Sequence, residues 1–274
     1  MVNKDKDFES NGLKIDQERV LTFSKMRCPL DCSYCFTEDL NIESNEDGTY
    51  LSEGQLMLLR KLPDNIKSIM LGCDTEFFID KQKSIEIIEN LLESKKDISI
   101  VTKLFLPPDF VARLSAINKQ MKIGGNFLAI SVSLPCLNSA RKWEPKAPKP
   151  KSRIDTLKIL HDHDINTMVA IRPLLPDVPN EEIEQIISLT KDFCFGYYSG
   201  PLYLKHLDSA LLGHDFSNLS IEMINPHWMP GGNIFYKIER RGQMDDFKKI
   251  LAKHDLRVFD GAAEGLEYIR HEKH

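Results

Sequence analysis

Three cysteines close together are the residues whose types and spacing most clearly indicate chemistry. Cys28, Cys32 and Cys35 form a C-x3-C-x2-C pattern just after an apolar run at residues 20–23. Three thiolates on one tight loop can hold three corners of a cubane iron–sulfur cluster. Zinc is the alternative metal, but structural zinc usually takes four ligands, and this loop has no second cysteine pair and no histidine nearby. Three thiolates would be an unusual catalytic zinc site, so the pattern favours an iron–sulfur cluster.

The other three cysteines are far apart, at Cys73, Cys136 and Cys194. The N-terminus has no apolar export signal, and disulfides are not expected in a chain of 274 residues of this kind. We therefore expect a single cluster and otherwise ordinary thiols. The formal net charge of -5 and the 42% of apolar residues are typical of a cytoplasmic enzyme for small molecules. No apolar run approaches the length of a membrane span.

The elements that must position the cysteine loop follow from the hydrophobic pattern. Helices are predicted after Ser52, where Gln55 completes a capping box, after Asp80, from residues 108 and 150, and after an N-cap at Asn180. The predicted strands are residues 20–23, 68–71, 98–102, 127–133, 167–171 and about 193–204. This alternation predicts parallel βα units, in an open doubly wound sheet or a barrel. In both, ligands gather at the carboxyl ends of the strands, which is where the cysteine loop begins.

The two ends of the chain show a weaker pattern. Residues 1–15 are predicted to be a mobile tail, and residues 16–212 the core. Within residues 213–274 we expect a loop at 226–232, a strand at 234–238, a helix around Phe247 and a strand at 256–259. This C-terminal extension is predicted to pair with the sheet or to cover the site.

The C-x3-C-x-aromatic-C pattern after a first strand resembles the radical S-adenosylmethionine (SAM) superfamily. The resemblance implies a partial (β/α)6 TIM-like barrel with a C-terminal α/β extension. It implies that the cysteines bind three irons of a [4Fe–4S] cluster, while the amino and carboxylate groups of SAM chelate the fourth iron. Tyr34 stands at the aromatic position, which in the family lies near the adenine.

The resemblance is closest to the spore photoproduct lyase-like branch and extends over residues 20–205. Gly72 to Glu76 matches a SAM-contacting segment, although Glu76 replaces the usual Asp and the glycine-rich G-G-E motif of the superfamily is absent. Lys103, in a V-T-K segment, is expected to face the SAM carboxylate. The residues 143–148 resemble an E-P-x-A-P loop. The implied cofactor-binding residues are Tyr34, Phe36, Gly72, Thr75, Glu76, Lys103, Ser131 and Arg172.

Cys73 is the predicted catalytic residue. In spore photoproduct lyase a cysteine in a comparable stretch donates a hydrogen atom to the product radical, and a thiol suits this role because its S–H bond is weak. The alternative is that Cys73 is a small buried side chain. Tyr197 and Tyr198 are predicted to line the substrate cavity or to pack in the core. The basic residues between Arg141 and Arg153 are predicted to form a solvated loop and helix start.

The implied activity is reductive cleavage of SAM to a 5′-deoxyadenosyl radical that abstracts hydrogen from a small-molecule or nucleotide-like substrate. An external donor of the flavodoxin or ferredoxin type would supply the electron. The acidic balance and the single Trp143 among the basic residues 141–153 argue against nucleic acid as a partner. The alternatives are a non-catalytic iron–sulfur or zinc module and, within the family, a nucleic-acid repair enzyme resembling spore photoproduct lyase.

Overall fold

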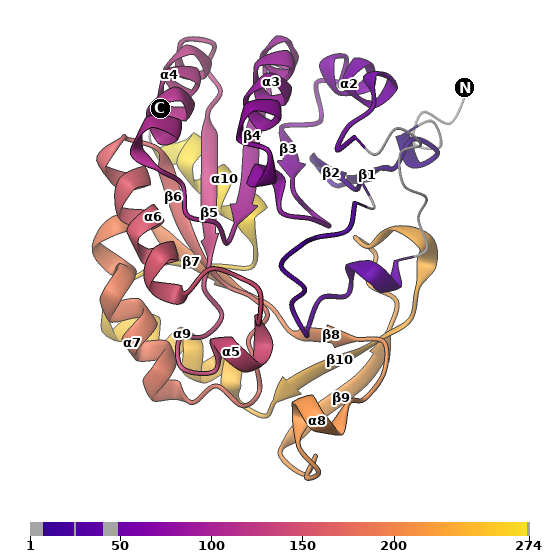
Figure 1. The fold of residues 1–274 in the computed structure, drawn as a ribbon, viewed down its shortest axis with the longest axis vertical. Coiled ribbons are helices and arrows are strands. Elements are labelled where there is room, and N and C mark those ends of the chain that lie inside the picture. Colours follow the sequence, from indigo (N-terminus) through magenta and orange to yellow (C-terminus); the bar gives the residue numbers. More distant parts are fainter. Residues whose placement is uncertain (1–7, 25, 41–48, 273–274) are drawn as a thin grey trace.

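The protein folds around one twisted, mostly parallel sheet (Figure 1). The computed structural model describes residues 8–24, 26–40 and 49–272. The strand order is β1-β2-β3-β4-β5-β6-β7-β11, in which only the β1–β2 pair is antiparallel. The strands are β1 (Leu13–Asp16), β2 (Arg19–Thr22), β3 (Ser68–Leu71), β4 (Asp97–Thr102), β5 (Leu128–Ser133), β6 (Asn166–Ile171), β7 (Gly196–Ser199) and β11 (Val258–Phe259). The predicted α/β partial barrel is confirmed, with β2 to β7 as its six parallel strands.

The predicted helices follow their strands in the expected order. They are α2 (Glu53–Arg60), α3 (Lys81–Leu91), α4 (Pro108–Ile123), α6 (Pro150–Asp162) and α7 (Asn180–Thr190), with a short α5 (Ala140–Trp143) before α6. The capping box of Ser52 and Gln55 is present at the start of α2. The predicted N-cap at Asn180 is wrong, because Pro179 occupies that position. The Asn180 side chain instead bonds Asp246 and Arg240, 3.0 and 2.7 Å away.

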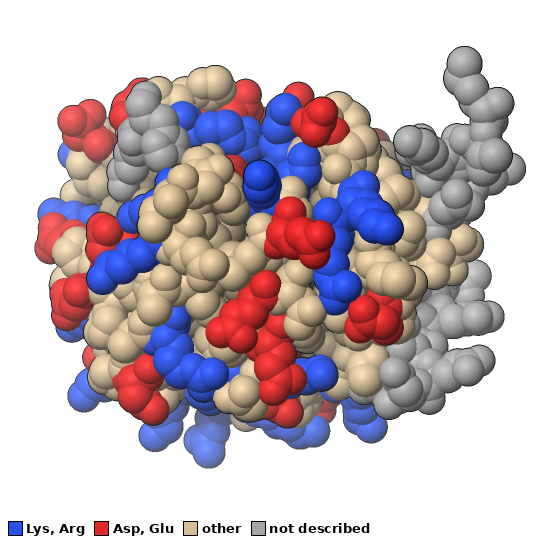
Figure 2. All heavy atoms as spheres, turned by 90° about the horizontal axis from the view of Figure 1, so that it is seen from above, with Lys and Arg blue, Asp and Glu red and all other residues tan. Residues whose placement is uncertain are grey.

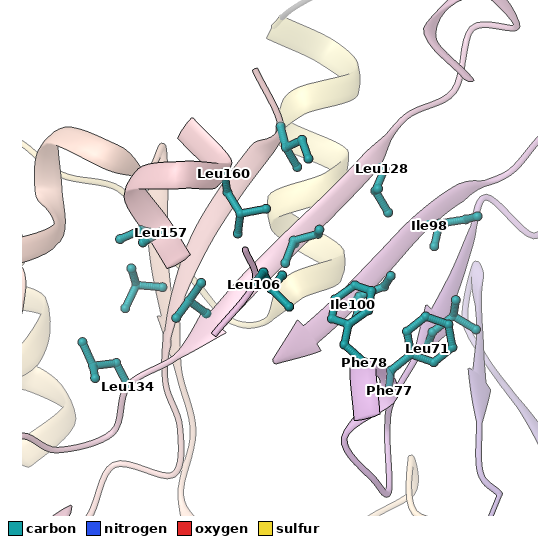
Figure 3. Close-up of a cluster of buried hydrophobic side chains, with 14 of the residues drawn as sticks. Leu71, Phe77, Phe78, Ile98, Ile100, Leu106, Leu128, Leu134, Leu157 and Leu160 are labelled. Atoms are coloured by element: carbon teal, nitrogen blue, oxygen red, sulfur yellow. The ribbon is translucent and has the colours of Figure 1, made fainter. Parts of the chain in front are cut away.

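Helices α2 to α7 cover what we call the outer face of the sheet. Alternate strand residues point to this face and join helix residues in one apolar cluster, part of which Figure 3 shows, with Ile100 and Leu128 from the strands and Leu157 and Leu160 from α6. These side chains are almost completely removed from water. Because burial of each such side chain stabilises the fold by about 1.5–3 kcal/mol, the outer core holds the strand ends in fixed register.

The other face of the sheet, the inner face, is covered at one end by the C-terminal helix α10 (Ala262–Glu272). Leu266 and Ile269 of this helix pack in one cluster with Met70 and Met168 of the strands. Arg270 of α10 also forms an ion pair with Asp97, the first residue of β4. Helix α10 therefore closes the amino-terminal end of the partial barrel and leaves its carboxyl end for the site.

A second, three-stranded sheet has the order β8-β10-β9 and is antiparallel. It contains β8 (Leu202–Leu204), β9 (Leu219–Ile224) and β10 (Phe235–Arg240), with α8 (Ser209–Leu212) after β8 and a turn η5 (Pro230–Gly232) before β10. Helix α9 (Gln243–Lys253) then leads to β11. Figure 1 shows this second sheet beside the carboxyl edge of the main sheet. The C-terminal extension thus both pairs with the sheet, through β11, and stands at the site.

Three predicted boundaries differ from the structure. The sequence predicts one strand near residues 193–204, but the chain breaks after β7 and β8 joins the second sheet. A division between residues 212 and 213 would cut this second sheet, because β8 lies before it and β9 after it. Residues 13–15 of the predicted N-terminal tail pair with β2 in β1, while residues 1–7 lie outside the described part of the chain. Local patterns do not encode such long-range pairing.

Surface charge is mixed. Figure 2 shows acidic and basic side chains interspersed on the face seen from above, with neither sign forming a continuous field there. Within the described residues, none of the helices combines the length and the apolar character that crossing a bilayer requires.

Candidate functional site

The cysteine loop connects β2 to the short turn η1 (Thr37–Asp39) and lies at the carboxyl edge of the sheet, facing the second sheet (Figure 1). Cys28, Cys32 and Cys35 all line one cavity of about 590 Å³, and Asp74 from the loop after β3 lines it with them. Each of the three thiols is half-buried and free. The structure thus brings the predicted cluster ligands together around one space.

Backbone contacts hold this loop in place. The Cys35 amide donates to the Cys32 carbonyl at 2.9 Å, which closes a tight turn between two of the thiols. The Ser33 amide donates to the carbonyl of Trp143 at 2.9 Å, and the Ser33 hydroxyl donates to the carbonyl of Lys142 at 3.1 Å. Helix α5 therefore fixes the loop from the other side of the site.

The environment of the thiols suits a cluster. Burial raises the pKa of the Cys32 thiol to about 11 and also raises the pKa of Cys35, whereas the Lys103 ammonium acts against both shifts by favouring thiolates. Among residues 8–24, 26–40 and 49–272, no three His, Cys, Asp or Glu side chains converge on one metal-ion position. A cubane does not need such convergence, because each cysteine binds a different iron. Three thiols around a shared cavity, with a cation beside them, fit a [4Fe–4S] cluster.

A buried group of charged side chains supports the loop from beneath. The Glu144 side chain has no exposed surface and accepts a hydrogen bond from the Tyr34 hydroxyl. Lys103 Nζ lies 3.8 Å from the oxygen that accepts this bond, and the other oxygen lies 2.6 Å from the Arg153 guanidinium. The Lys103 ammonium also stands 5.6 Å from the centre of the Tyr34 ring. This set, which we call the Glu144 cluster, ties the residue before Cys35 to the end of β4.

Arg153 corrects the expectation of a solvated basic segment. Its side chain is completely buried, because it reaches from α6 under the loop after β5. There Nε donates to the carbonyl of Pro148 and one Nη to that of Ser133, at 2.9 and 3.2 Å. The neighbouring Lys142 behaves as expected, with 40% of its side chain exposed.

The loop after β3 begins with Gly72, whose φ of +78° turns the chain toward the cavity. A Cβ at this position would lie 3.3 Å from Cβ of Phe77 and from the carbonyl of Thr75, so glycine is required. Asp74, buried, accepts a hydrogen bond from the backbone amide of Ser24 at 2.7 Å. This bond joins the β3 loop to the start of the cysteine loop.

Thr75 and Glu76 continue this loop in different environments. Thr75 is half-buried, whereas the Glu76 carboxylate is buried and its hydrogen bonds are directed inward. One of its oxygens accepts from the Thr102 hydroxyl and the other from the amide of Lys103, both at 2.8 Å. Burial is the main reason that the pKa of Glu76 is raised. Glu76 is expected to contact the cofactor, but both of its carboxylate oxygens accept hydrogen bonds from the end of β4.

Cys73 points to the inner face. Its Sγ donates to the carbonyl of Met70 at 3.3 Å, and it packs at the margin of the inner apolar cluster. Burial raises the pKa of its thiol to about 12. At neutral pH the side chain is thus a protonated thiol, the form that can give up a hydrogen atom.

The strands place three further predicted residues on the inner face. Ser131 is buried, and neither its hydroxyl nor that of Tyr198 has a hydrogen-bond partner among the described residues. Burial raises the pKa of Tyr198, and the nearby Ser131 hydroxyl acts against this shift. Arg172 follows β6 and lies over Trp228, 5.5 Å from the ring centre. Tyr197 faces the outer core instead, where its hydroxyl lies 2.9 Å from that of Thr190. Of the two tyrosines, only Tyr198 can contribute to the inner face.

Phe36 contacts the C-terminal extension. Its ring meets those of Trp228 and Phe235 edge to face, with centroids 5.5 and 6.1 Å apart. The residue after the third cysteine therefore docks the cysteine loop onto the second sheet.

Sequence reasoning missed Asp74, Glu144 and Arg153 as site residues. Asp74 stands in the segment that the resemblance singles out, and its position directly after Cys73 at a strand exit is a usable signal. Glu144 and Arg153 form the buried pair only because two chain segments nine residues apart fold over the end of β5. No local pattern distinguishes Arg153 from the exposed lysines around it.

Residues 25–190, more than half of the chain, match the family model described as the radical SAM superfamily. The chain belongs to the radical SAM superfamily. Members of this superfamily are enzymes that use a [4Fe–4S] cluster and SAM, the two cofactors predicted from the sequence. The cysteine loop, the β3 loop and the Glu144 cluster all lie within the matched region.

A protein of Methanocaldococcus jannaschii, MJ0683, described as uncharacterized, is 27% identical over 209 residues, which cover 71% of this chain and 74% of that protein. SuiB of Streptococcus suis, solved with bound SAM, superimposes with a TM-score of 0.57 at 12% identity over 92% of this chain and 52% of SuiB. A spore photoproduct lyase variant gives 0.56 at 10% identity over 82% of this chain and 71% of the lyase.

These structural similarities show that the radical SAM fold is shared. At 10–12% identity they do not carry a substrate or a reaction to this protein. The chain spans about half the length of SuiB, so the activity of the whole of SuiB is not implied.

Proposed function

We propose that this protein is a radical SAM enzyme that holds one [4Fe–4S] cluster on Cys28, Cys32 and Cys35 and binds SAM beside it. The observation that carries the proposal is that the three thiols line one cavity at the carboxyl edge of the sheet, next to the Lys103 ammonium. Three protein thiolates for four irons leave one iron open, and a chelating cosubstrate requires such an open position.

When bound and reduced, the cluster would supply the electron that cleaves SAM to methionine and a 5′-deoxyadenosyl radical, which abstracts hydrogen from the substrate. The chain contributes the positions of the reacting groups and the exclusion of water. An electron donor of the flavodoxin or ferredoxin type and a small-molecule or nucleotide-like substrate complete the proposal.

Lys103 is the residue proposed to receive the SAM carboxylate. Its side chain is largely buried, and its charge acts on Cys32 and Cys35. Glu76 would position Lys103 rather than bind the cofactor, because its oxygens hold the Lys103 amide and the preceding Thr102. The Glu144 cluster would hold Tyr34 against the same cation.

Gly72, Thr75 and Ser131 remain proposed SAM contacts on the strand exits. Cys73 is proposed as the hydrogen-atom donor to the product radical, since it stays protonated and points to the inner face. Phe36 is proposed to support the site indirectly by holding the cysteine loop against the second sheet.

Anaerobic reconstitution tests the proposal. The wild-type protein should bind about four irons per chain, and with dithionite and SAM it should release 5′-deoxyadenosine slowly even without substrate. Replacement of Cys28, Cys32 and Cys35 together by alanine should abolish both the iron and the deoxyadenosine.

The matched control is Cys194→Ala, which removes a thiol at the start of β7 on the outer side of the sheet. This variant should keep the iron content of the wild type. A wild-type protein that took up one zinc per chain, or a fully loaded and reduced cluster that released no deoxyadenosine, would show that the proposal is wrong.

A further inference from the structure

Arg172 is a cation for which the fold provides no anion. The residue follows β6 directly, at the carboxyl edge, and its side chain lies on the inner face. Within residues 8–24, 26–40 and 49–272, its guanidinium forms no ion pair and donates no hydrogen bond. The other arginine of this region, Arg19, is paired with Asp16 at 3.0 Å through Nε. The side chain is half-buried, and a partly desolvated guanidinium without an anion gains stability when a ligand supplies one.

The side chains around Arg172 are suited to bind a ligand, and we call this group the Arg172 receptor. Trp228 lies across the guanidinium, and Tyr203 meets Trp228 with ring centroids 6.0 Å apart. Tyr198 stands within electrostatic range of the guanidinium and is itself 3% exposed, with a hydroxyl that has no hydrogen-bond partner within the described part of the chain. An unpaired cation, an unsatisfied buried hydroxyl and aromatic faces therefore meet between the main sheet and the C-terminal extension.

This receptor is separate from the cation beside the cysteines. Lys103 Nζ lies 3.8 Å from Glu144 and 5.6 Å from the centre of the Tyr34 ring, whereas Arg172 lies over Trp228. SAM that chelates a cluster iron must have its carboxylate at the cluster, and so on the Lys103 side. An anion at Arg172 consequently belongs to another molecule, and not to SAM as the family resemblance implies. Tyr198 and Cys73 belong to the same apolar cluster, which places the proposed hydrogen donor on this inner face.

We propose that Arg172 binds an oxyanion, a carboxylate or a phosphate, of the substrate, and that Trp228 and Tyr203 flank the adjoining part of that molecule. This inference rests on the proposed function, since it names the substrate class of the same site. A guanidinium presents a planar fork of donors that matches both oxyanions, so the two sources share one chemistry. Trp228 comes from the C-terminal extension, and Tyr203 comes from β8, which pairs with β10 of the extension; the extension thereby has a role in substrate binding.

Three small probes with one phenyl ring separate these possibilities. Benzoate carries a carboxylate, phenyl phosphate a phosphate, and benzyl alcohol no charge. Each is titrated by calorimetry into the reconstituted, oxidised protein at low ionic strength, with and without SAM, because salt screens the attraction. At low-millimolar concentrations one or both anions should bind and benzyl alcohol should not, and saturating SAM should not displace them.

Two variants locate the binding. Arg172→Gln should weaken the anion at least tenfold, and Arg172→Lys, which lacks the planar fork, should weaken it less. Gly200→Ala keeps the charge but places a methyl 3.0 Å from Nε of Arg172, so it should also weaken binding without removing the cation. Arg241→Gln, at an exposed arginine between β10 and α9, is the matched control and should bind like the wild type.

The inference is overturned if neither anion binds, if benzyl alcohol binds as well as the anions, or if SAM displaces the bound anion. It is also overturned if Arg172→Gln and Gly200→Ala both keep the full affinity of the wild type for the anion. These outcomes are independent of the iron content and the deoxyadenosine release that test the proposed function. A protein that binds the anion but never cleaves SAM would contradict only that proposed function.

Discussion

At the scale of single residues, the charge of Glu144 is expected to contribute strongly to the free energy of unfolding. Replacing Glu144 by Gln keeps its shape and leaves the fully buried Arg153 and the nearby Lys103 without a counter-charge. Breaking a buried pair by removing one partner costs about 3–5 kcal/mol, because the remaining charge is uncompensated. We expect Glu144→Gln to lower the free energy of unfolding by that amount, measured by urea denaturation of the reconstituted protein.

The control for this prediction is the exposed pair of Lys142 and Asp177, 2.7 Å apart. Lys142→Gln should cost less than about 1 kcal/mol, since surface pairs contribute little. Equal effects of the two substitutions would show that the buried charge of Glu144 is not needed.

The thiol of Cys73 gives a prediction about pH. Iodoacetamide reacts with the thiolate, and an ordinary cysteine with a pKa of about 8.5 stops gaining reactivity above that pH. Burial raises the pKa of Cys73 to about 12, so its thiolate fraction is lost as pH falls below that value and keeps rising with pH up to it. The alkylation rate of the peptide containing Cys73, followed by mass spectrometry, should increase about tenfold per pH unit from pH 7 to 10. A plateau near pH 9 would show an ordinary thiol.

At the scale of elements, the close approach of α10 to β6 depends on Gly265. A Cβ at this position would lie 2.2 Å from Sδ of the fully buried Met168 and 3.4 Å from the Phe259 ring. Gly265→Ala should therefore destabilise the fold by about 1–3 kcal/mol through overpacking, despite the better helix propensity of alanine. The midpoint of chemical denaturation measures this loss.

A double-mutant cycle identifies its cause. Because Met168→Ala removes the atoms that clash, the double variant should be more stable than the sum of the single effects by at least about 1 kcal/mol. Gly54→Ala is the matched control, since that helical glycine has no neighbour closer than 3.8 Å, and it should be neutral or stabilising. Additive effects of the two core substitutions would contradict the proposed clash.

At the scale of the whole molecule, the core and the C-terminal extension form one folding unit. The extension supplies β11 to the main sheet, α10 to its inner face and two of the three strands of the second sheet. A chain that ends at Leu212 would expose Met70, Met168 and the other inner residues to water. We expect this truncated chain to lose its near-ultraviolet circular dichroism and to bind a hydrophobic dye, as a loosely packed state does.

A chain that ends at Glu272 serves as the control and should melt cooperatively like the full protein. If the chain ending at Leu212 also melted in one sharp transition, the extension would be an independent domain, as the division after residue 212 predicts.

The sequence by itself determined the order of the βα units and the placing of three cysteines on one loop. Periodicity shows which side of a strand or helix is apolar, and three cysteines on one loop need no tertiary contact to be close together. Glycine at position 72 is likewise a local requirement, because the turn after β3 has a positive φ. The capping box at Ser52 could be predicted for the same reason: its hydrogen bonds join residues three apart.

Only the tertiary structure decided which polar side chains are buried and which partners they meet. Arg153 has the same local surroundings as exposed lysines, and its burial follows from α6 crossing the end of β5. Glu76 turned toward Lys103 because the loop after β3 lies against the end of β4, and Arg172 is half-buried because Trp228 of the C-terminal extension lies against it. The physical reason is that burial and charge pairing depend on contacts between segments distant in the sequence. The sequence pattern shows which face of a helix or strand is apolar, but it does not show which residues pack against that face.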